Sequence, residues 1–324
     1  MRTMGARVLL IGGCIILAIW LGYFYGMSSM APPSHALVKR NLIVGDSRPE
    51  NLAQRLLLPE KTYIPLPPAE SKQTQSMRDK FSRLSDGRLF ALDAWNRPEQ
   101  GGRFYASYVV DRCRFAAAFT EIQTQGQPET PKKISDHVNV IAAFDRIKRI
   151  CGQFTKDELD SLSGLSAISQ NKLVSDTYLV ASEKLSSAEK THDTRARQEA
   201  IDSILGTGDP LLIDSIGMKL SIFRDGGGIF LYFDGQKYYV NTAPPLMAAF
   251  YLLPCGMGLG CDISQDLDLQ LTCASGGQCY TDRFAKVLAV DAGGDASRYQ
   301  MILNSYASLL AAVKNKNVEK FIPK

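Results

Sequence analysis

The chain has 324 residues, of which 45% are hydrophobic, and its 37 basic and 33 acidic residues leave a net charge of +4. This near balance, with the charges spread along the chain, argues against a nucleic-acid-binding surface, which needs clustered Lys and Arg. The apolar fraction is ordinary for a globular protein, and the chain is long enough to bury one large core or two smaller ones.

An uncharged apolar segment lies near the N-terminus. Residues 8–25 read VLLIGGCIILAIWLGYFY, and a helix needs about 20 such residues to cross the hydrocarbon core of a membrane. Arg2 and Arg7 precede this segment, whereas the first basic residues after it are Lys39 and Arg40. Because basic residues are retained on the cytoplasmic side, this bias predicts a cytoplasmic N-terminus and an exported C-terminal part.

Two other interpretations of the segment remain open. A cleavable signal peptide has a shorter apolar core, of about 7 to 15 residues, and its best cleavage sites here are residues 29–31, before Pro32, and residues 34–36. A lipoprotein signal resembles residues 11–14, but cleavage before Cys14 would cut the apolar run in its middle. We therefore expect residues 1–30 to form a retained anchor or uncleaved signal in a bacterial inner membrane, spanning it once.

The next part of the chain is rich in proline. Seven prolines lie between residues 32 and 68, and proline favours extended backbone, so residues 31–70 are expected to form a semi-rigid spacer. Residues 49–58 could form a short helix within it. The exported domain is expected to cover residues 71–324.

Helical periodicity dominates from residue 71 onward. Thr155 and Glu158 form a capping-box pair, which marks a helix start. A helix over residues 193–205 and a second one from Asp209 to Phe223, joined by a glycine turn, are the clearest pair. The other predicted helices cover residues 72–84, 86–95, 98–119, 133–151, 245–253, 264–274, 280–290 and 295–318.

One β-hairpin is predicted at residues 228–240, which read GIFLYFDGQKYYV. Asp234 and Gly235 between two aromatic-rich runs are a strong signal for a two-residue turn. An isolated hairpin is marginal in water, so it must pack on helices, pair with a third strand or meet a partner. Its aromatic side chains could serve as anchors of an interaction surface, because they exceed what a short ribbon buries by itself. The candidate residues of this surface are Phe230, Tyr232, Tyr238 and Tyr239.

A cysteine-rich module is expected at residues 245–290. Cys255, Cys261, Cys273 and Cys279 are separated by gaps of five, eleven and five residues. Structural zinc sites usually use ligand pairs two to four residues apart, so the spacing and the exported location favour disulfides over zinc. Local pairs, Cys255 with Cys261 and Cys273 with Cys279, are expected, although four cysteines allow three connectivities.

Cys113 and Cys151 remain as a third pair. In two antiparallel neighbouring helices, a rise of ~1.5 Å per residue would place Cys113 near Val138 and not beside Cys151. The bond therefore requires crossed or broken helices. The expected fold class is mainly α, an irregular helical bundle or solenoid-like array with one β-hairpin, stabilised by disulfides.

Three segments carry a resemblance to other proteins. They read GGRFYASYVVDRC, AFDRIKRIC and MAAFYLLPCGMGLGCDISQDLDLQLTCASGGQC. They resemble uncharacterised exported helical proteins of proteobacteria that share paired cysteines near the C-terminus. The resemblance covers the chain from about Phe81 onward. It implies a helical fold and an exported location, and it implies no activity.

Residues that could carry chemistry are few. The three histidines, His35, His137 and His192, lie in the spacer or in polar helical contexts typical of solvated residues. The sequence contains no G-x-S-x-G, H-E-x-x-H or C-x-x-C motif. Asp262, Asp266 and Asp268 resemble part of a calcium loop but lack its glycine turn and terminal glutamate, so a helix cap is the expected role.

We therefore predict no catalytic, cofactor-binding or metal-binding residue and no cofactor. The expected function is that of a membrane-anchored periplasmic component that binds or scaffolds within the cell envelope. Its expected partners are the inner membrane, through residues 8–25, and an envelope protein, with no nucleic acid. The alternative is an exported enzyme that acts on envelope or cell-wall material through carboxylates that the sequence does not identify.

Overall fold

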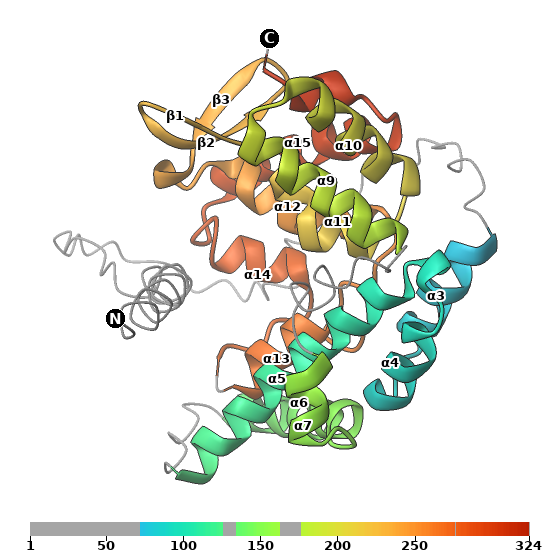
Figure 1. Ribbon diagram of the computed structural model, residues 1–324. Helices are drawn as coiled ribbons and strands as arrows, with labels where there is room; N and C mark the ends of the chain where they lie inside the picture. Colours follow the sequence, from blue (N-terminus) through green and yellow to red (C-terminus); the bar gives the residue numbers. More distant parts are fainter. Residues whose placement is uncertain (1–71, 126–133, 163–175, 276, 324) are drawn as a thin grey trace, which may run out of the picture. The chain divides into compact units, whose positions relative to one another are not determined.

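The computed structural model describes residues 72–125, 134–162, 176–275 and 277–323 (Figure 1). These residues belong to one compact unit, Leu66–Lys324. The predicted anchor at residues 8–25, the spacer at 31–70 and the short helix at 49–58 lie outside the described residues. Within the described ranges, no helix has both the length and the apolar character needed to cross a membrane.

The described chain is mainly α-helical, as predicted. Four 3-10 turns among the described residues join or extend the helices: η1 (Pro98–Gln100), η2 (Gly217–Leu220), η3 (Val240–Thr242) and η4 (Val318–Phe321). The α-helices are α3 (Lys72–Ser82), α4 (Gly87–Trp95), α5 (Gly102–Gln125), α6 (Ile134–Cys151), α7 (Lys156–Leu162), α9 (Thr177–Thr191), α10 (Thr194–Thr207), α11 (Pro210–Ile216), α12 (Pro245–Gly256), α13 (Leu267–Ala274), α14 (Arg283–Ala289) and α15 (Ala296–Lys314).

Polar side chains set most of the helix starts. The predicted capping box is confirmed: Thr155 N donates to Glu158 Oε2 at 2.9 Å, and Glu158 N donates to Thr155 Oγ1 at 3.2 Å. Aspartates cap seven further helix starts, because each carboxylate accepts a hydrogen bond from a free backbone N–H of the first turn. These caps are Asp86, Asp176, Asp193, Asp209, Asp266, Asp282 and Asp295.

Helix α9 lies in a stretch for which the sequence provided no prediction. Its buried side chains are Tyr178, Ala181, Leu185 and Ala188, which follow helical spacing. Two of the four are alanines, whose small apolar area makes the periodicity weak in the sequence. Asp176 accepts hydrogen bonds from Tyr178 N and Leu179 N and so begins the helix.

The predicted hairpin is confirmed and gains a third strand. Strands β1 (Ile222–Asp225), β2 (Gly228–Phe233) and β3 (Gln236–Tyr239) form an antiparallel sheet in that order (Figure 1). Asp234 and Gly235 have φ values of 52° and 83°, the positive angles that a two-residue hairpin turn of this type requires.

The prediction that a helix continues from Asp209 to Phe223 is wrong. Helix α11 ends at Ile216, and after η2 the chain enters β1. Ile222 and Phe223 pair with Leu231 and Phe230 of β2, where β-branched and aromatic side chains pack well. Pairing with the hairpin therefore overrides the apolar run that suggested a helix.

The main hydrophobic core draws on most helices and on one face of the sheet. Leu231 and Phe233 of β2 reach this core, and the Phe233 ring centroid lies 5.4 Å from that of Phe321 in η4. A second cluster lies among α12, α14 and α15, where Leu252, Val287 and Ile302 are fully buried. The C-terminal segment is thus packed against the sheet.

Candidate functional site

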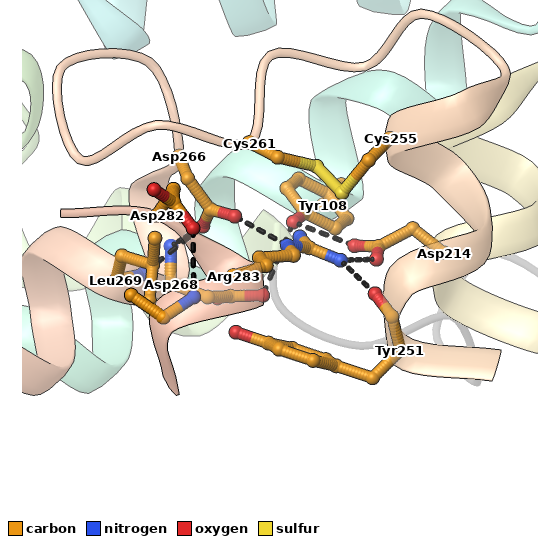
Figure 2. The surroundings of a disulfide bond; sticks show 11 residues. Tyr108, Asp214, Tyr251, Cys255, Cys261, Asp266, Asp268, Leu269, Asp282 and Arg283 are labelled. Atoms are coloured by element: carbon orange, nitrogen blue, oxygen red, sulfur yellow. Dashed lines mark hydrogen bonds and ion pairs between the residues drawn. A yellow bond between two sulfur atoms is a disulfide. The ribbon is translucent and has the colours of Figure 1, made fainter. Parts of the chain in front are cut away.

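The most highly charged buried group of the described residues is centred on Arg283, the first residue of α14. Its side chain is 1% exposed. The guanidinium donates from Nε to Asp266 Oδ2, from Nη1 to Asp214 Oδ1, and from Nη1 to Tyr251 O at 3.0 Å. Figure 2 shows the guanidinium between the two carboxylates, beside the disulfide of Cys255 and Cys261. Arg283 thereby joins α11, α12, the N-terminus of α13 and α14.

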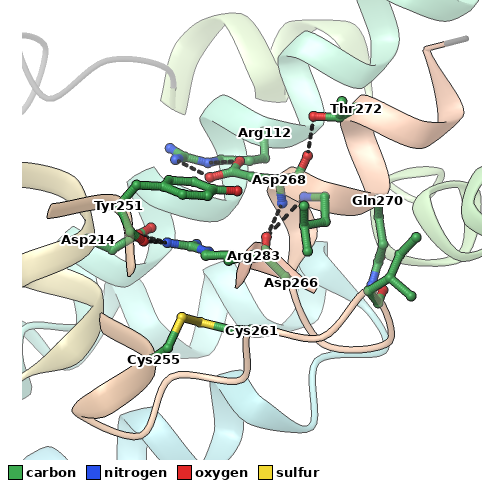
Figure 3. Close-up of polar contacts among 12 residues, drawn as sticks. Arg112, Asp214, Tyr251, Cys255, Cys261, Asp266, Asp268, Gln270, Thr272 and Arg283 are labelled. Atoms are coloured by element: carbon green, nitrogen blue, oxygen red, sulfur yellow. Dashed lines mark hydrogen bonds and ion pairs between the residues drawn. A yellow bond between two sulfur atoms is a disulfide. The ribbon is translucent and has the colours of Figure 1, made fainter. Parts of the chain in front are cut away.

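A second arginine extends this network from α5. Arg112 forms two parallel hydrogen bonds to Asp268, from Nε to Oδ1 at 3.1 Å and from Nη2 to Oδ2 at 3.2 Å (Figure 3). The guanidinium carbon of Arg112 also lies 3.6 Å from the Tyr108 ring centroid. The Tyr108 hydroxyl lies 3.3 Å from both Asp214 Oδ2 and Asp268 Oδ2, so it connects the two arginine-carboxylate groups.

The electrostatics of the network favour the charged forms of Arg283 and Asp268 but not that of Asp266. Burial by itself opposes the charge of Arg283, but Asp214 and Asp266 outweigh it and hold the Arg283 pKa well above its usual value. Burial likewise opposes ionisation of Asp268, but Arg112 and Arg283 together hold the Asp268 pKa below its usual value. Burial raises the pKa of Asp266 despite its bond to Arg283. Three carboxylates thus face two guanidinium groups, and burial lowers the pKa of the nearby Lys286 while Asp268 and Asp266 oppose that shift.

These contacts define what the group can do chemically. Asp266 Oδ1 accepts hydrogen bonds from Asp268 N and Leu269 N at 2.9 and 3.0 Å, so both of its oxygens are used. The Arg112 and Asp268 side chains reach the surface, with exposures of 27% and 33%. An ionised, paired carboxylate accepts hydrogen bonds and does not donate a proton. The arrangement is therefore suited to holding helices together.

A second buried polar group joins α5, α9 and α11. The Asp176 carboxylate accepts from Arg103 N and Phe104 N of α5 as well as from the start of α9. Asp209 Oδ2 accepts from the Tyr105 hydroxyl at 2.7 Å and from the Tyr178 hydroxyl at 3.3 Å. Burial raises the pKa values of Asp176 and Asp209, and the hydrogen bonds oppose that rise. Each carboxylate thereby caps one helix while binding another.

The six predicted cysteines form the three predicted disulfides. Cys255 bonds to Cys261 and Cys273 bonds to Cys279, each across a sequence separation of 6. Cys113 and Cys151 form the third bond, with their Cα atoms 5.0 Å apart. Cys113 lies in the middle of α5 and Cys151 is the last residue of α6, and α6 packs mainly against α13. The long bond therefore joins helices that are not simple antiparallel neighbours.

The four aromatic residues proposed as an interaction surface do not share one face of the sheet. Phe230, Tyr232 and Tyr239 lie on one face, whereas Tyr238 pairs with Leu231 on the face toward the core. Phe230 and Tyr232 are buried, with exposures of 4% and 7%. Tyr238 and Tyr239 are half-buried. The accessible part of this proposed surface therefore consists of the two β3 tyrosines.

The buried arginines and tyrosines of the site come from distant segments and were not predicted from the sequence. Arg283 follows the cap Asp282, and Arg112 lies in a helix with other charged residues, so neither carries a local signal for burial. Asp266 is confirmed as a helix cap, and Asp262 accepts a hydrogen bond from Ser264 N at 2.8 Å. In the described ranges, no cluster of three or more His, Cys, Asp or Glu residues could hold a metal ion.

Comparisons with known proteins add no assignment. The chain matches no protein-family model, no curated protein and no solved structure.

Proposed function

We propose that this protein is a membrane-anchored component of the bacterial envelope that binds or scaffolds a partner protein. Residues 8–25 would hold it in the inner membrane, and residues 71–324 would lie in the periplasm. The observation that carries the proposal is the set of three disulfides formed by the six cysteines that follow the apolar segment. Disulfides form and persist in oxidising compartments such as the periplasm.

The polar groups of the domain support binding over chemistry. Each buried carboxylate of the Arg283 network bridges separate helices, so its geometry serves rigidity. The alternative, an exported enzyme, needs a carboxyl group free to face a substrate. Asp268 is the network carboxylate that reaches the surface, and both of its oxygens are bound by Arg112. A rigid domain held at a distance from the membrane suits a scaffold.

Reporter fusions test the proposed topology. Alkaline phosphatase fused after Ser71 or after Lys324 should be active, and the protein should stay in the membrane after an alkaline wash. The control replaces Arg2 and Arg7 with glutamate, which removes the charge bias and should lower reporter activity. An inactive reporter in the unaltered chain would refute export, and release of a shorter soluble form would refute the retained anchor.

Photocrosslinking tests the binding role. A photoreactive amino acid at Tyr238 or Tyr239, both partly accessible, should yield one defined protein adduct in intact cells. The same amino acid at Gln300, an exposed position on α15, is the matched control and should yield none. Equal adducts at all three positions, or no adduct at either tyrosine, would contradict a partner surface on the sheet.

A further inference from the structure

One face of the sheet holds an ammonium group that belongs to the chain itself. Lys237 Nζ lies 4.5 Å from the ring centroid of Phe230 and donates a hydrogen bond to Asp225 Oδ2 at 2.8 Å. Tyr239 flanks the same group: its ring centroid lies 5.9 Å from that of Phe230, and its hydroxyl lies 3.3 Å from Asp225 Oδ2. The Lys237 ammonium thus contacts the Asp225 carboxylate and the face of the Phe230 ring, with the Tyr239 ring alongside.

The register of the sheet explains this arrangement. Phe230 of β2 pairs with Tyr239 of β3, and Tyr232 pairs with Lys237, so these side chains share one face. Asp225 of β1 lies opposite Gly228, which has no side chain. Gly227 N donates a hydrogen bond to Asp225 Oδ1 at 2.9 Å, and a side chain at Gly227 would collide with the Tyr239 hydroxyl, so this glycine lets Tyr239 approach the Asp225 carboxylate.

We propose that Asp225, Phe230 and Tyr239 form a binding site for an alkylammonium group, which Lys237 occupies in this structure. A cation over aromatic faces beside a carboxylate is the chemistry by which proteins recognise ammonium ligands. Phe230 is 4% exposed although it belongs to neither core cluster. Phe223 of β1 stacks on its ring, with 5.8 Å between the ring centroids, and the Lys237 ammonium lies over the same ring. Removing Lys237 would therefore leave the Phe230 ring, beside Phe223 and Tyr239, without a cation.

The occupying lysine is easily displaced. The side chains of Lys237 and Asp225 are 48% and 30% exposed, and an exposed ion pair of this kind is weak. A ligand ammonium group would make the same contacts while Lys237 turned into solvent. The inference rests on the proposed binding role and deepens it by naming the chemical class of the ligand.

The same sheet offers a matched comparison. Lys320 forms an exposed ion pair with Asp234 at 2.9 Å, and its Nζ lies 5.9 Å from the Phe233 ring centroid. The Phe233 ring packs against Phe321 in the main core. Lys320 therefore resembles Lys237 in charge and pairing but covers a ring that would stay buried without it. Its removal should create no ammonium site.

Titration of the full-length protein in a maltoside detergent with tetramethylammonium, followed by NMR of the probe, tests the site. Lys237→Ala should bind the probe saturably and at least tenfold more tightly than the unaltered protein, whereas Lys320→Ala should behave like the unaltered protein. tert-Butanol, a neutral molecule of similar size, should not bind saturably. Lys237→Gln serves as a second variant and should also bind more tightly.

Further substitutions in the Lys237→Ala protein identify the contacts. Asp225→Asn and Tyr239→Leu should each weaken binding of tetramethylammonium at least tenfold. No saturable binding to either Lys237 variant, or equal tightening in Lys320→Ala, would overturn the proposal. If N-acetyl-lysine amide displaces tetramethylammonium, the natural ammonium group comes from a peptide. If phosphatidylethanolamine vesicles displace it, the ammonium group comes from a lipid. The alkaline phosphatase fusions do not alter the sheet, so their result is independent of the result of the tetramethylammonium titration.

Discussion

Arg283 Nη1 donates a hydrogen bond to Asp214 Oδ1 across 69 residues of sequence. The Arg283 side chain is 1% exposed and that of Asp214 is 8% exposed. Together with Asp266, this pair is the buried ionic link among α11, α13 and α14. Because each partner is out of reach of bulk water, each depends on the other for solvation of its charge.

Replacing Arg283 by methionine should lower the free energy of unfolding by about 3 to 5 kcal/mol, because it leaves Asp214 and Asp266 as uncompensated buried charges. Urea unfolding followed by circular dichroism measures this loss. Arg195→Met is the control, since the Arg195 side chain is 90% exposed, and it should change the free energy by no more than about 0.5 kcal/mol. Adding Asp214→Asn to the Arg283→Met protein should restore part of the loss. Equal effects of the two arginine substitutions would contradict the structural role of Arg283.

The three disulfides should differ in how much they contribute to the free energy of unfolding. Replacing both Cys113 and Cys151 by alanine removes a bond across a sequence separation of 38, and replacing Cys255 and Cys261 removes one across 6. Loop-closure entropy predicts losses of about 4 and about 2 kcal/mol in the free energy of unfolding. Urea unfolding of both double variants tests this order. A larger loss for the short loop would show that the Cys255–Cys261 bond acts mainly by positioning Arg283 and its partners.

The Arg88–Glu158 ion pair should make stability depend on acid pH. Hydrogen bonds from Arg88, and then from the Thr155 backbone, lower the pKa of Glu158 to about 2, whereas a glutamate in the unfolded chain has a pKa of about 4.3. A depressed folded-state pKa adds stability above the unfolded value, and this stability is lost as the pH falls toward about 2. Unfolding free energies of the unaltered protein and of Glu158→Gln should therefore differ at pH 6 and converge near pH 2.

The control for this pH dependence is Glu199→Gln, which alters an exposed pair between Arg195 and Glu199 within one helix. It should change the unfolding free energy little at any pH. A difference between Glu158→Gln and the unaltered protein that stays constant from pH 6 to pH 2 would contradict the ion-pair explanation.

Ala243 lies in a left-handed backbone conformation, with φ of 45°. A side chain is unfavourable in that region, so Ala243→Gly should raise the free energy of unfolding by about 1 kcal/mol. The matched control is Ala307→Gly, at an exposed position within α15, which should lower it by about 1 kcal/mol. Thermal unfolding of both variants measures whether each substitution raises or lowers the free energy of unfolding. A loss of stability in both would show that the loop conformation of Ala243 is not strained.

Features that depend on near neighbours could be predicted from the sequence. Asp209 before Pro210, the Thr155 and Glu158 pair, and the Asp234-Gly235 turn each act within a few residues, and each appears in the structure where it was predicted. The two short disulfides follow from the same locality, because a separation of 6 keeps their cysteines close in any compact fold. Where the local signal was weak, as in the alanine-rich face of α9, the sequence supplied no prediction.

Contacts between side chains that are distant in the sequence follow from how the helices and strands pack together. Arg283 finds Asp214 and Asp266 because helices that carry no mutual sequence signal pack together, and burial then requires each charge to have a partner. The sequence predicted Phe230 and Tyr239 together as parts of an interaction surface, but the packing of the three strands leaves Phe230 buried and Tyr239 partly accessible. Local patterns fix turns and helix starts through bonds within a few residues, whereas pairing across the core depends on how all the elements pack.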